Sequence, residues 1–315
     1  MKSSETDSAY SESDLRSYAT SLSSSVENYK WENGRRFHSY REGTYNFPND
    51  ELEQERLDLL HYVNLGLMND KLFLAPIDTD RPLRVLDVGT GTGTWAMDMG
   101  DKYPNAEVLG NDLSPIQPRW VPPNVHFEVD DVESPWPPRS PFDFIHVRYM
   151  AGSIMDWPKF MRNCLEQTTP GGWIEFQDYA PIPYTEDNSE GPDNKFIEFF
   201  MLIEEACEKM GRIASPGRHL KGWAQEAGLT NVQHRMYKLP IGPWPKDKGL
   251  RNLGGVNLTQ ILEGLEGLTV ALFPRVLGWS VERVQVFLSE VRKDATKKSV
   301  HCLHEFHVVY GQKPE

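Results

Sequence analysis

The chain has 315 residues, of which 39% are hydrophobic, and a formal net charge of −13. This composition allows one sizeable buried core, in one or two domains. The negative charge argues against attraction to nucleic-acid phosphates or anionic lipid as the main activity. No stretch reaches the roughly 18 apolar residues of a membrane span, and the Ser-rich start lacks the apolar core of a signal peptide. We therefore expect a protein of the cytoplasm or the nucleus, without direct nucleic-acid or membrane partners.

The three cysteines, Cys164, Cys207 and Cys302, are widely spaced and form no metal-binding pattern. His304 and His307 stand three residues apart in an alternating stretch, which is typical of a strand rather than of a zinc motif. We expect reduced, buried thiols and no metal site.

The N-terminal part falls into three segments. Ser, Glu, Asp and Thr dominate the first of them, which predicts a disordered tail over residues 1–28. From Tyr29 to Asn49, aromatic side chains alternate with arginines, a mixture that usually docks on another part of a protein. Asn49 or Asp50 then caps an amphipathic helix, with acidic residues in its first turn and leucines at helical spacing. The second and third segments form a predicted N-terminal cap, residues 29–80.

From Arg84 onward, strands and helices alternate, which is typical of a doubly wound parallel sheet. We expect a Rossmann-like α/β domain over residues 81–315, with a helical insertion at 247–277. Seven strands are expected, at 85–88, 106–111, 125–129, 142–147, 172–178, 232–239 and 305–310. Further helices are expected at 95–102, 155–167, 194–210, 218–227 and 281–293.

A glycine-rich turn, Gly89-Thr90-Gly91-Thr92-Gly93, links the first of these strands to a helix. Glycine lets backbone N–H groups approach a ligand closely, because it has no Cβ and tolerates positive φ. The spacing falls short of the dinucleotide fingerprint, since position 94 is Thr, and the turn lacks the Lys of a P-loop. Asp87, just before the turn, would repel a pyrophosphate and suits a ligand with an ammonium group.

Further acidic residues follow the next two strands. Asp112 is placed to accept hydrogen bonds from ribose hydroxyls. Asp131, with Val132 beside it, is placed to accept one from an adenine amino group, and Asp130 competes for this role. The carboxyl ends of parallel strands share one sheet edge, where open α/β folds bind ligands. The three acids therefore predict one cleft.

The motif from Asp87 to Gly93, together with Asp112 and Asp131, resembles the class I S-adenosylmethionine (SAM)-dependent methyltransferases. This resemblance implies SAM as cofactor and a seven-stranded sheet with an antiparallel last strand. Five shorter stretches resemble the fungal LaeA-like methyltransferases: 40–45, 47–51, 112–118, 121–124 and 278–280. The narrower resemblance, from about Tyr29 to Pro314, implies a fungal origin and a link to secondary metabolism.

The expected cofactor contacts are Tyr45, Asp87, Gly89, Thr90, Gly91, Gly93, Asp112, Leu113, Asp131, Val132 and Arg148. Arg148 follows a strand and is expected either to pair with a carboxylate near the cofactor or to form a structural salt bridge. By resemblance, Tyr45 folds over the cofactor; the alternative is that its segment packs on the sheet.

Methyl transfer needs mainly proximity and alignment, with a general base only where the acceptor must lose a proton. The candidate catalytic residues are His146, Tyr149 and Gln177, and the candidates nearer the C-terminus are His301, His304 and His307. A structural role is the alternative for each. The apolar insertion at 247–277 is the candidate wall of the acceptor pocket and suggests a hydrophobic small molecule.

The leading hypothesis is a SAM-dependent methyltransferase acting on a small-molecule secondary metabolite. One alternative is a SAM-binding regulator of fungal secondary metabolism that acts through protein partners, with the Ser-rich tail as a docking segment. Another is a non-methylating, SAM-dependent pericyclase. A nicotinamide dehydrogenase is the rival at the level of the fold, and it would respond to NAD(P) and not to SAM.

Overall fold

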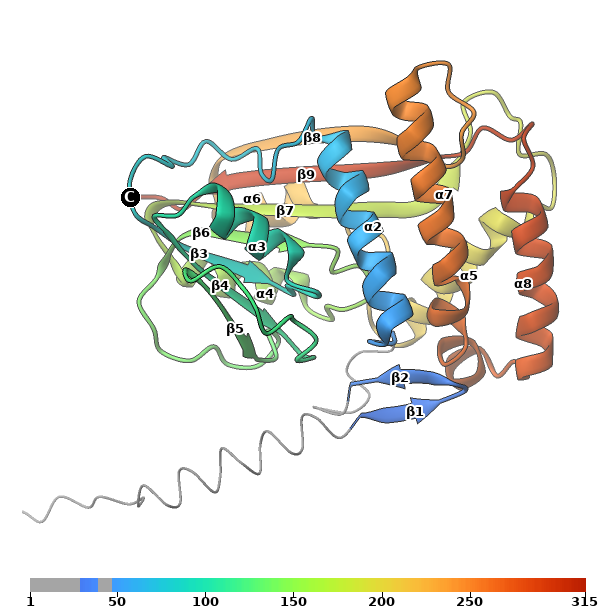
Figure 1. Ribbon diagram of the computed structural model, residues 1–315, viewed down its shortest axis with the longest axis horizontal. Coiled ribbons are helices and arrows are strands. Elements are labelled where there is room, and N and C mark those ends of the chain that lie inside the picture. The colour runs from blue at the N-terminus through green and yellow to red at the C-terminus, as the bar shows by residue number, and fades with distance from the viewer. Residues whose placement is uncertain (1–28, 39–46) are drawn as a thin grey trace, which may run out of the picture.

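The computed structural model describes residues 29–38 and 47–315. The predicted disordered tail, and Tyr45 as a residue over the cofactor, lie outside these residues. A seven-stranded sheet forms the centre, in the order β5-β4-β3-β6-β7-β9-β8 (Figure 1). Its strands are β3 (Leu83–Val88), β4 (Ala106–Asp112), β5 (Val125–Val129), β6 (Phe142–Arg148), β7 (Thr168–Tyr184), β8 (Thr230–Pro240) and β9 (Leu303–Gln312). Strands β3 to β7 pair in parallel, and β9 runs antiparallel to β7 and β8. The predicted sheet with an antiparallel last strand is therefore confirmed.

Helices cover both faces of the sheet because successive strand residues point to opposite sides. On β3, Val85 packs with Trp95 of α3 (Thr94–Lys102), whereas Leu86 packs in the cluster of α4 (Trp157–Glu166) and α6 (Leu220–Glu226). Two longer helices, α2 (Glu51–Leu67) and α7 (Lys248–Thr269), lie side by side over the β7-β9-β8 part of the sheet (Figure 1).

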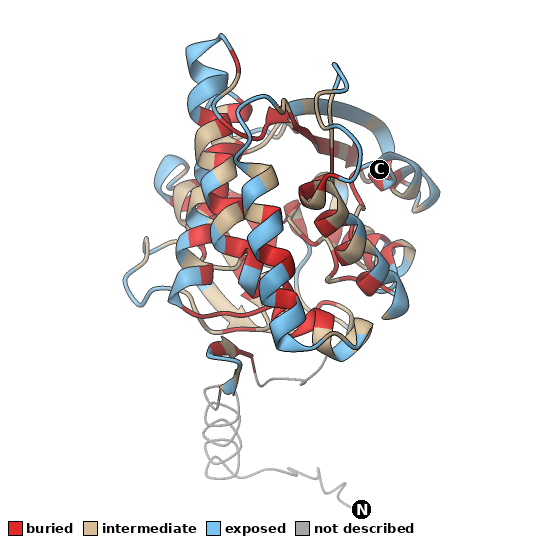
Figure 2. Cartoon of the chain, turned by 90° about the vertical axis from the view of Figure 1, so that its right-hand side faces the viewer, coloured by how far each residue is buried: buried red, intermediate tan, exposed pale blue. Residues whose placement is uncertain are grey.

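The predicted insertion is one long helix, α7, followed by a short π-helix, η1 (Phe273–Leu277). With α5 (Lys195–Lys209) and α8 (Val281–Ala295) these elements enclose a second apolar cluster. In Figure 2 the buried residues of these helices face inward and the exposed residues face solvent. The C-terminal half therefore adds a helical layer with a core of its own.

A two-stranded hairpin, β1 (Lys30–Glu32) and β2 (Arg35–Phe37), precedes α2 and was not predicted. Its turn residues Asn33 and Gly34 have φ of +49° and +78°. Positive φ at both central residues is the requirement of a type I′ turn, for which Asn-Gly is the preferred sequence. The expected docking of the arginine-rich segment is seen at Asp50, the N-cap of α2, which binds Arg35 Nε at 2.5 Å.

Strand β7 begins before the predicted strand and absorbs the predicted turn at 169–172. The reason is pairing with the chain end, because Gly171 N donates to Lys313 O at 3.0 Å and Lys313 N donates to Gly172 O at 2.9 Å. Such distant partners are invisible to a local pattern.

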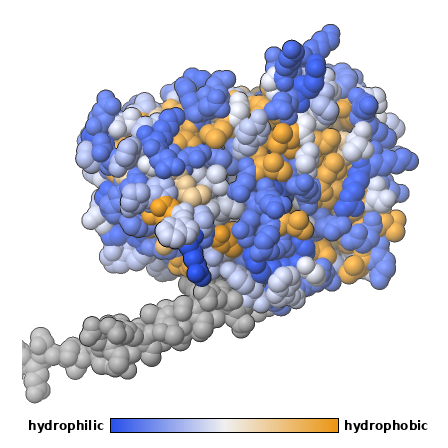
Figure 3. All heavy atoms as spheres, viewed as in Figure 1, coloured by the Kyte–Doolittle hydropathy of each residue, from blue (hydrophilic) through white to orange (hydrophobic). Residues whose placement is uncertain are grey.

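All three cysteines are buried and unpaired. In the described part of the chain, no three His, Cys, Asp or Glu side chains gather as metal ligands. Within the same residues, none of the helices combines the length and apolar character that a membrane crossing needs. On the face shown in Figure 3, hydrophilic residues predominate and hydrophobic ones form separate groups.

Helix α7 touches the segment that follows β8 through its backbone at Gly254. Gly242 N donates to Gly254 O at 2.8 Å, and a Cβ on Gly254 would lie 2.4 Å from Gly242 O. At Gly255, one residue on, a Cβ would meet only Pro243 Cβ, at 4.0 Å. The two glycines are therefore neighbours in the same helix, but only Gly255 has space for a Cβ atom.

We predict that Gly254→Ala lowers the free energy of unfolding by about 1–3 kcal/mol, because backbone must move to admit the methyl group. Gly255→Ala should raise it by about 0.5–1 kcal/mol through helix propensity. Urea denaturation of both variants measures the difference. Equal stabilisation of both would contradict the close approach.

Glu175 of β7 ties the segment before β3 to the sheet. Its Oε2 accepts hydrogen bonds from Leu74 N and Ala75 N at 2.7 Å each, and its Oε1 accepts one from Gln177 Nε2 at 2.7 Å. Burial raises the pKa of Glu175 from 4.5 to about 7. The native protein thus holds a proton that the unfolded chain has lost. Its contribution to stability is complete below pH 4.5 and is lost as the pH rises through 7.

Glu175→Gln keeps the shape of this side chain and removes its titration. We predict that, as the pH rises from 4.5 to 7, the free energy of unfolding of the variant increases relative to that of the wild type by on the order of 3 kcal/mol. Chemical denaturation at a series of pH values provides the comparison. Glu226→Gln, at an exposed position of α6, should stay parallel to the wild type. A constant offset between Glu175→Gln and the wild type would refute the raised pKa.

Candidate active site

A cleft opens where β3, β4, β5 and β6 end, and we call it the glycine-loop cleft. Helix α2 supplies the facing wall, with Leu57, Leu60, His61 and Asn64. Eight of the predicted cofactor residues line the cleft: Gly89, Thr90, Gly91, Asp112, Leu113, Asp131, Val132 and Arg148. The structure therefore brings together residues from Gly89 to Arg148, because the carboxyl ends of the parallel strands share one edge of the sheet.

The glycine turn is built from left-handed backbone. Gly89, Gly91 and Gly93 have φ of +66°, +57° and +80°, a region that glycine adopts without strain. Gly93 caps α3 and does not line the cleft; a Cβ there would lie 2.5 Å from the Phe127 ring. Its glycine is needed for the turn and for packing.

Asp112 fastens the turn to the end of β4. Its Oδ2 accepts a hydrogen bond from Gly91 N at 2.9 Å, and its Oδ1 accepts one from Ser114 N at 2.9 Å. Burial raises the pKa of Asp112, against the opposing effect of these two hydrogen bonds. Since Asp112 also lines the cleft, its carboxylate both shapes the turn and meets the cleft.

Asp87 is buried and is not among the residues that line the cleft, so its role beside an ammonium group stays a prediction. One carboxylate oxygen accepts from Thr90 Oγ1 at 2.6 Å, and the other lies 2.7 Å from His146 Nδ1. A desolvated carboxylate is costly unless it is paired, and here the pairing groups come from the chain itself. Asp87 holds the glycine turn from beneath.

Asp131 lines the cleft, and its carboxylate also organises the turn after β5. The two oxygens accept hydrogen bonds from Glu133 N at 3.0 Å and Ser134 Oγ at 2.9 Å. The competing Asp130 also lines the cleft, and its Oδ1 accepts from Asp131 N at 2.8 Å.

Arg148 is a half-buried cation whose guanidinium meets a neutral partner. Its Nη2 donates to His61 Nδ1 at 2.8 Å, and His61 Nε2 lies 2.9 Å from Asp98 Oδ2. Burial lowers the pKa of His61, which favours its neutral form. Arg148 Nη1 is buried and lacks a hydrogen-bond partner within the described residues. The same holds for the Nδ2 of Asn64, one turn after His61 on α2. Two N–H donors in residues of the cleft wall, Arg148 Nη1 and Asn64 Nδ2, thus have no hydrogen-bond partner within the described residues.

A second space adjoins the cleft, and Leu60 and Tyr149 line both. We call it the aromatic cavity, because four aromatic side chains line it: Phe47, Tyr149, Tyr179 and Phe200. Helix α7 forms one wall, so part of the predicted insertion does face a cavity.

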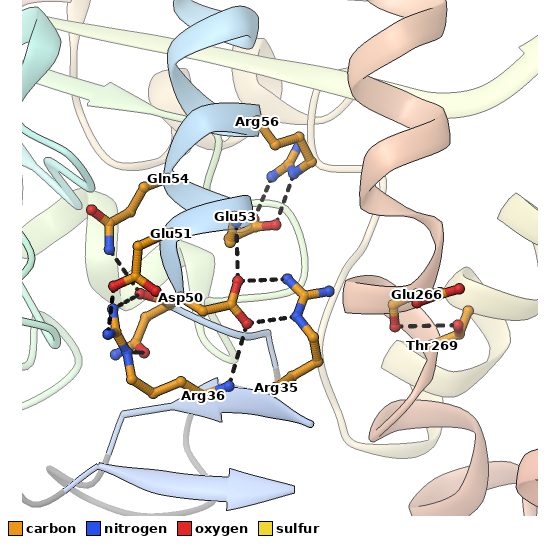
Figure 4. A network of polar contacts seen from close by, with 10 residues as sticks. Arg35, Arg36, Asp50, Glu51, Glu53, Gln54, Arg56, Glu266 and Thr269 are labelled. Carbon is orange, nitrogen blue, oxygen red and sulfur yellow. Dashed lines mark hydrogen bonds and ion pairs between the residues drawn. The ribbon is translucent and has the colours of Figure 1, made fainter. Parts of the chain in front are cut away.

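The polar side chains in the walls of the aromatic cavity form a continuous chain of bonds. Glu53 holds Arg56 through contacts of 2.6 and 2.9 Å, as Figure 4 shows. Arg56 Nη1 donates to Gln260 Oε1, and Gln260 Nε2 to Asn257 Oδ1, each at 2.9 Å. Asn257 Nδ2 ends the chain on Pro240 O at 2.9 Å. These groups satisfy one another and connect α2 to α7.

Two of the three catalytic candidates lie away from both spaces. His146 is fully buried under α3, stacked on Trp95 with 3.8 Å between ring centroids. Gln177 donates to Leu72 O at 3.1 Å and to Glu175. Tyr149 lines both spaces, with φ of +57° and with Arg56 5.5 Å from its ring centroid. The surroundings decide the difference, because Trp95 of α3 covers His146 and the segment before β3 covers Gln177, whereas Tyr149 follows the end of β6.

The C-terminal histidines also separate. His301 lies 2.6 Å from Asp187 at the surface, and His307 lies 2.9 Å from His234 on β8. Neither lines either of the two spaces described above, whereas His304 lines the aromatic cavity. The alternating pattern of β9 indicated that these histidines lie on a strand. It did not indicate which end of that strand meets the cavity.

Comparisons with known proteins agree with this geometry. Residues 59–234 match the methyltransferase domain family. The chain is 47% identical over 302 residues to the methyltransferase pytC of Aspergillus terreus, covering 96% of this chain and 93% of that protein. It is 34% identical over 290 residues to the secondary metabolism regulator LAE1 of Cochliobolus heterostrophus, covering 90% and 94%.

Among solved structures, phosphoethanolamine N-methyltransferase 2 of Haemonchus contortus, in complex with SAM, shares the fold. The TM-score is 0.50 at 14% identity, over 96% of this chain and 75% of that one. The chain therefore belongs to the SAM-dependent methyltransferases, in the LaeA-like fungal group.

Proposed function

We propose that the glycine-loop cleft binds SAM and that the aromatic cavity binds a hydrophobic small molecule, the methyl acceptor. Bound SAM supplies an activated methyl group on a positively charged sulfur. The observation that carries the proposal is that the two spaces share the wall formed by Leu60 and Tyr149. Methyl transfer depends on bringing two reactants together in line, and adjoining cavities provide that proximity.

The order of the strands supports one orientation of the cofactor. Along the sheet, the ends of β5, β4, β3 and β6 carry, in this order, Asp131, Asp112, the glycine turn and Arg148; Asp131 and the glycine turn follow their strands directly. Adenine beside Asp131 and Val132 would put the ribose hydroxyls at Asp112 and the amino-acid part near Arg148. Tyr45 as a cover over the cofactor remains a proposal from resemblance.

The donors of Arg148 and Asn64 fit the carboxylate of that amino-acid part. Burying a cation without a charged partner is costly, and an arriving carboxylate offsets that cost. Charge-assisted hydrogen bonds from a guanidinium are among the stronger ones in proteins. Arg148 thus acts as the cofactor's anchor in this proposal.

The aromatic cavity suits an apolar acceptor. The polar side chains of its wall, Glu53, Arg56, Gln260 and Asn257, are already paired with one another. Aromatic and aliphatic side chains therefore provide most of the free contact surface. A site with this lining favours a hydrophobic metabolite. The buried free thiols support a reducing compartment, the cytoplasm or the nucleus.

A second candidate function is regulation through protein partners, and the similarity to the regulator LAE1 favours it. In that case SAM binds without turnover of small molecules. The two functions separate in one assay: radiolabelled SAM is incubated with a panel of hydroxylated and aminated aromatic compounds. Methylated product with any of them supports the enzyme, and binding without product across the panel favours the regulator.

We predict that Arg148→Met weakens binding of S-adenosylhomocysteine by about 10- to 100-fold, since a charged hydrogen bond is lost. Binding of 5′-methylthioadenosine, which lacks the carboxylate, should change little. Isothermal titration calorimetry with both ligands measures the split. Arg162→Met, at an exposed position of α4, serves as the control. An equal loss for both ligands would show that Arg148 supports the cleft as a whole.

If the aromatic cavity holds the acceptor, a substitution there should change the KM of the acceptor but not the affinity for the cofactor. Ile203 of α5 lines the aromatic cavity, and Met201 on the same helix is exposed. We expect Ile203→Phe to raise the KM of any acceptor found in the panel by about tenfold, which corresponds to the loss of one good contact. Its affinity for S-adenosylhomocysteine should stay unchanged. Met201→Phe should leave both values unchanged. An unaltered KM in Ile203→Phe would place the acceptor elsewhere.

A further inference from the structure

His304, near the start of β9, is 4% exposed and lines the aromatic cavity. Two aromatic rings hold its imidazole edge-on. Phe200 lies 5.1 Å away at 85°, and Tyr179 lies 6.1 Å away at 68°, between ring centroids and planes. The ring is therefore fixed in one orientation.

The surroundings of His304 define its tautomer. The backbone of Pro181 raises the pKa of His304 against the larger, opposite effect of burial, and proline has no N–H to donate. The carbonyl oxygen must therefore accept, and the donor is Nδ1–H, because Nε2 is buried and makes no hydrogen bond within the described residues. A neutral imidazole protonated on Nδ1 carries its lone pair on Nε2.

Burial also keeps this imidazole neutral, because it lowers the pKa of His304 to about 3. At physiological pH, Nε2 can accept a hydrogen bond, but it is too weakly basic to hold a proton. The role open to it is recognition rather than proton removal.

Other polar groups of the cavity wall have partners. Glu53, Arg56, Gln260 and Asn257 form the chain described above, and Tyr179 donates to Asn64. Among the buried side-chain nitrogens and oxygens of the described cavity lining, Nε2 of His304 is the one without a partner. A buried acceptor left open costs free energy, and a donor on a ligand would remove that cost.

We propose that Nε2 of His304 accepts a hydrogen bond from an O–H or N–H group of the aromatic small molecule in the cavity. His304 thereby determines specificity: it favours molecules with such a donor over those in which the donor has been methylated. This inference rests on the proposed function, which assigns the aromatic cavity to the acceptor.

The test uses the full chain saturated with S-adenosylhomocysteine and two probes, 2-naphthol and 2-methoxynaphthalene, which differ at the O–H. We expect the wild type to bind 2-naphthol about tenfold more tightly, the usual effect of one hydrogen bond. His304→Phe should abolish this preference and leave the affinity for 2-methoxynaphthalene within twofold of the wild type. In His304→Gln a side-chain carbonyl replaces the lone pair, and part of the preference should return.

A spectroscopic readout needs no variant. With ¹⁵N-labelled histidine, the Nε2 resonance of His304 should move on addition of 2-naphthol and stay in place with 2-methoxynaphthalene.

Two results would overturn the inference in distinguishable ways. If the wild type binds both probes equally, the cavity remains an aromatic site and the role of His304 is refuted. If neither probe binds, the assignment of the cavity itself fails, and the inference fails with it. A preference that persists in His304→Phe would also refute the role of His304.

Discussion

A polar atom withdrawn from water must find a partner or raise the free energy of the fold, and the rest of this structure depends on that constraint. Asp87 and Asp112 satisfy it by bonding the glycine turn from below and from the side. The rigid loop that results exposes backbone to the cleft. Two polar atoms left without a partner, Arg148 Nη1 and His304 Nε2, belong to residues that line the cleft and the cavity, where a ligand can complete the pairing.

Helix α2 is the element that joins the two spaces. Its N-cap, Asp50, is held by the arginines of the β1-β2 hairpin (Figure 4). Its first turn carries Glu53 to the aromatic cavity, and its last turns carry Asn64 to the glycine-loop cleft. Leu60 lies between them and lines both. One helix thus sets the relative position of the two spaces, on which a transfer reaction depends.

Features that depend on neighbouring residues could be predicted from the sequence, whereas features that depend on packing between distant elements could not. Strand periodicity is local, so the sheet was predicted correctly, and the residues that follow each strand were recognised as one part of the cleft lining; the wall from α2 was not predicted. The hairpin at Asn33-Gly34 was local too and could have been found from its turn. His146 and His304 could not be told apart in advance, because burial under α3 or exposure to a cavity depends on packing between distant elements.

The two halves of the site come from different parts of the fold. Strand ends of the common sheet form the glycine-loop cleft, whereas α5 and α7 form much of the aromatic cavity. These helices have an apolar cluster of their own, apart from the clusters beneath the cleft. Substitutions in this layer can therefore reshape the cavity while the strand ends keep their geometry.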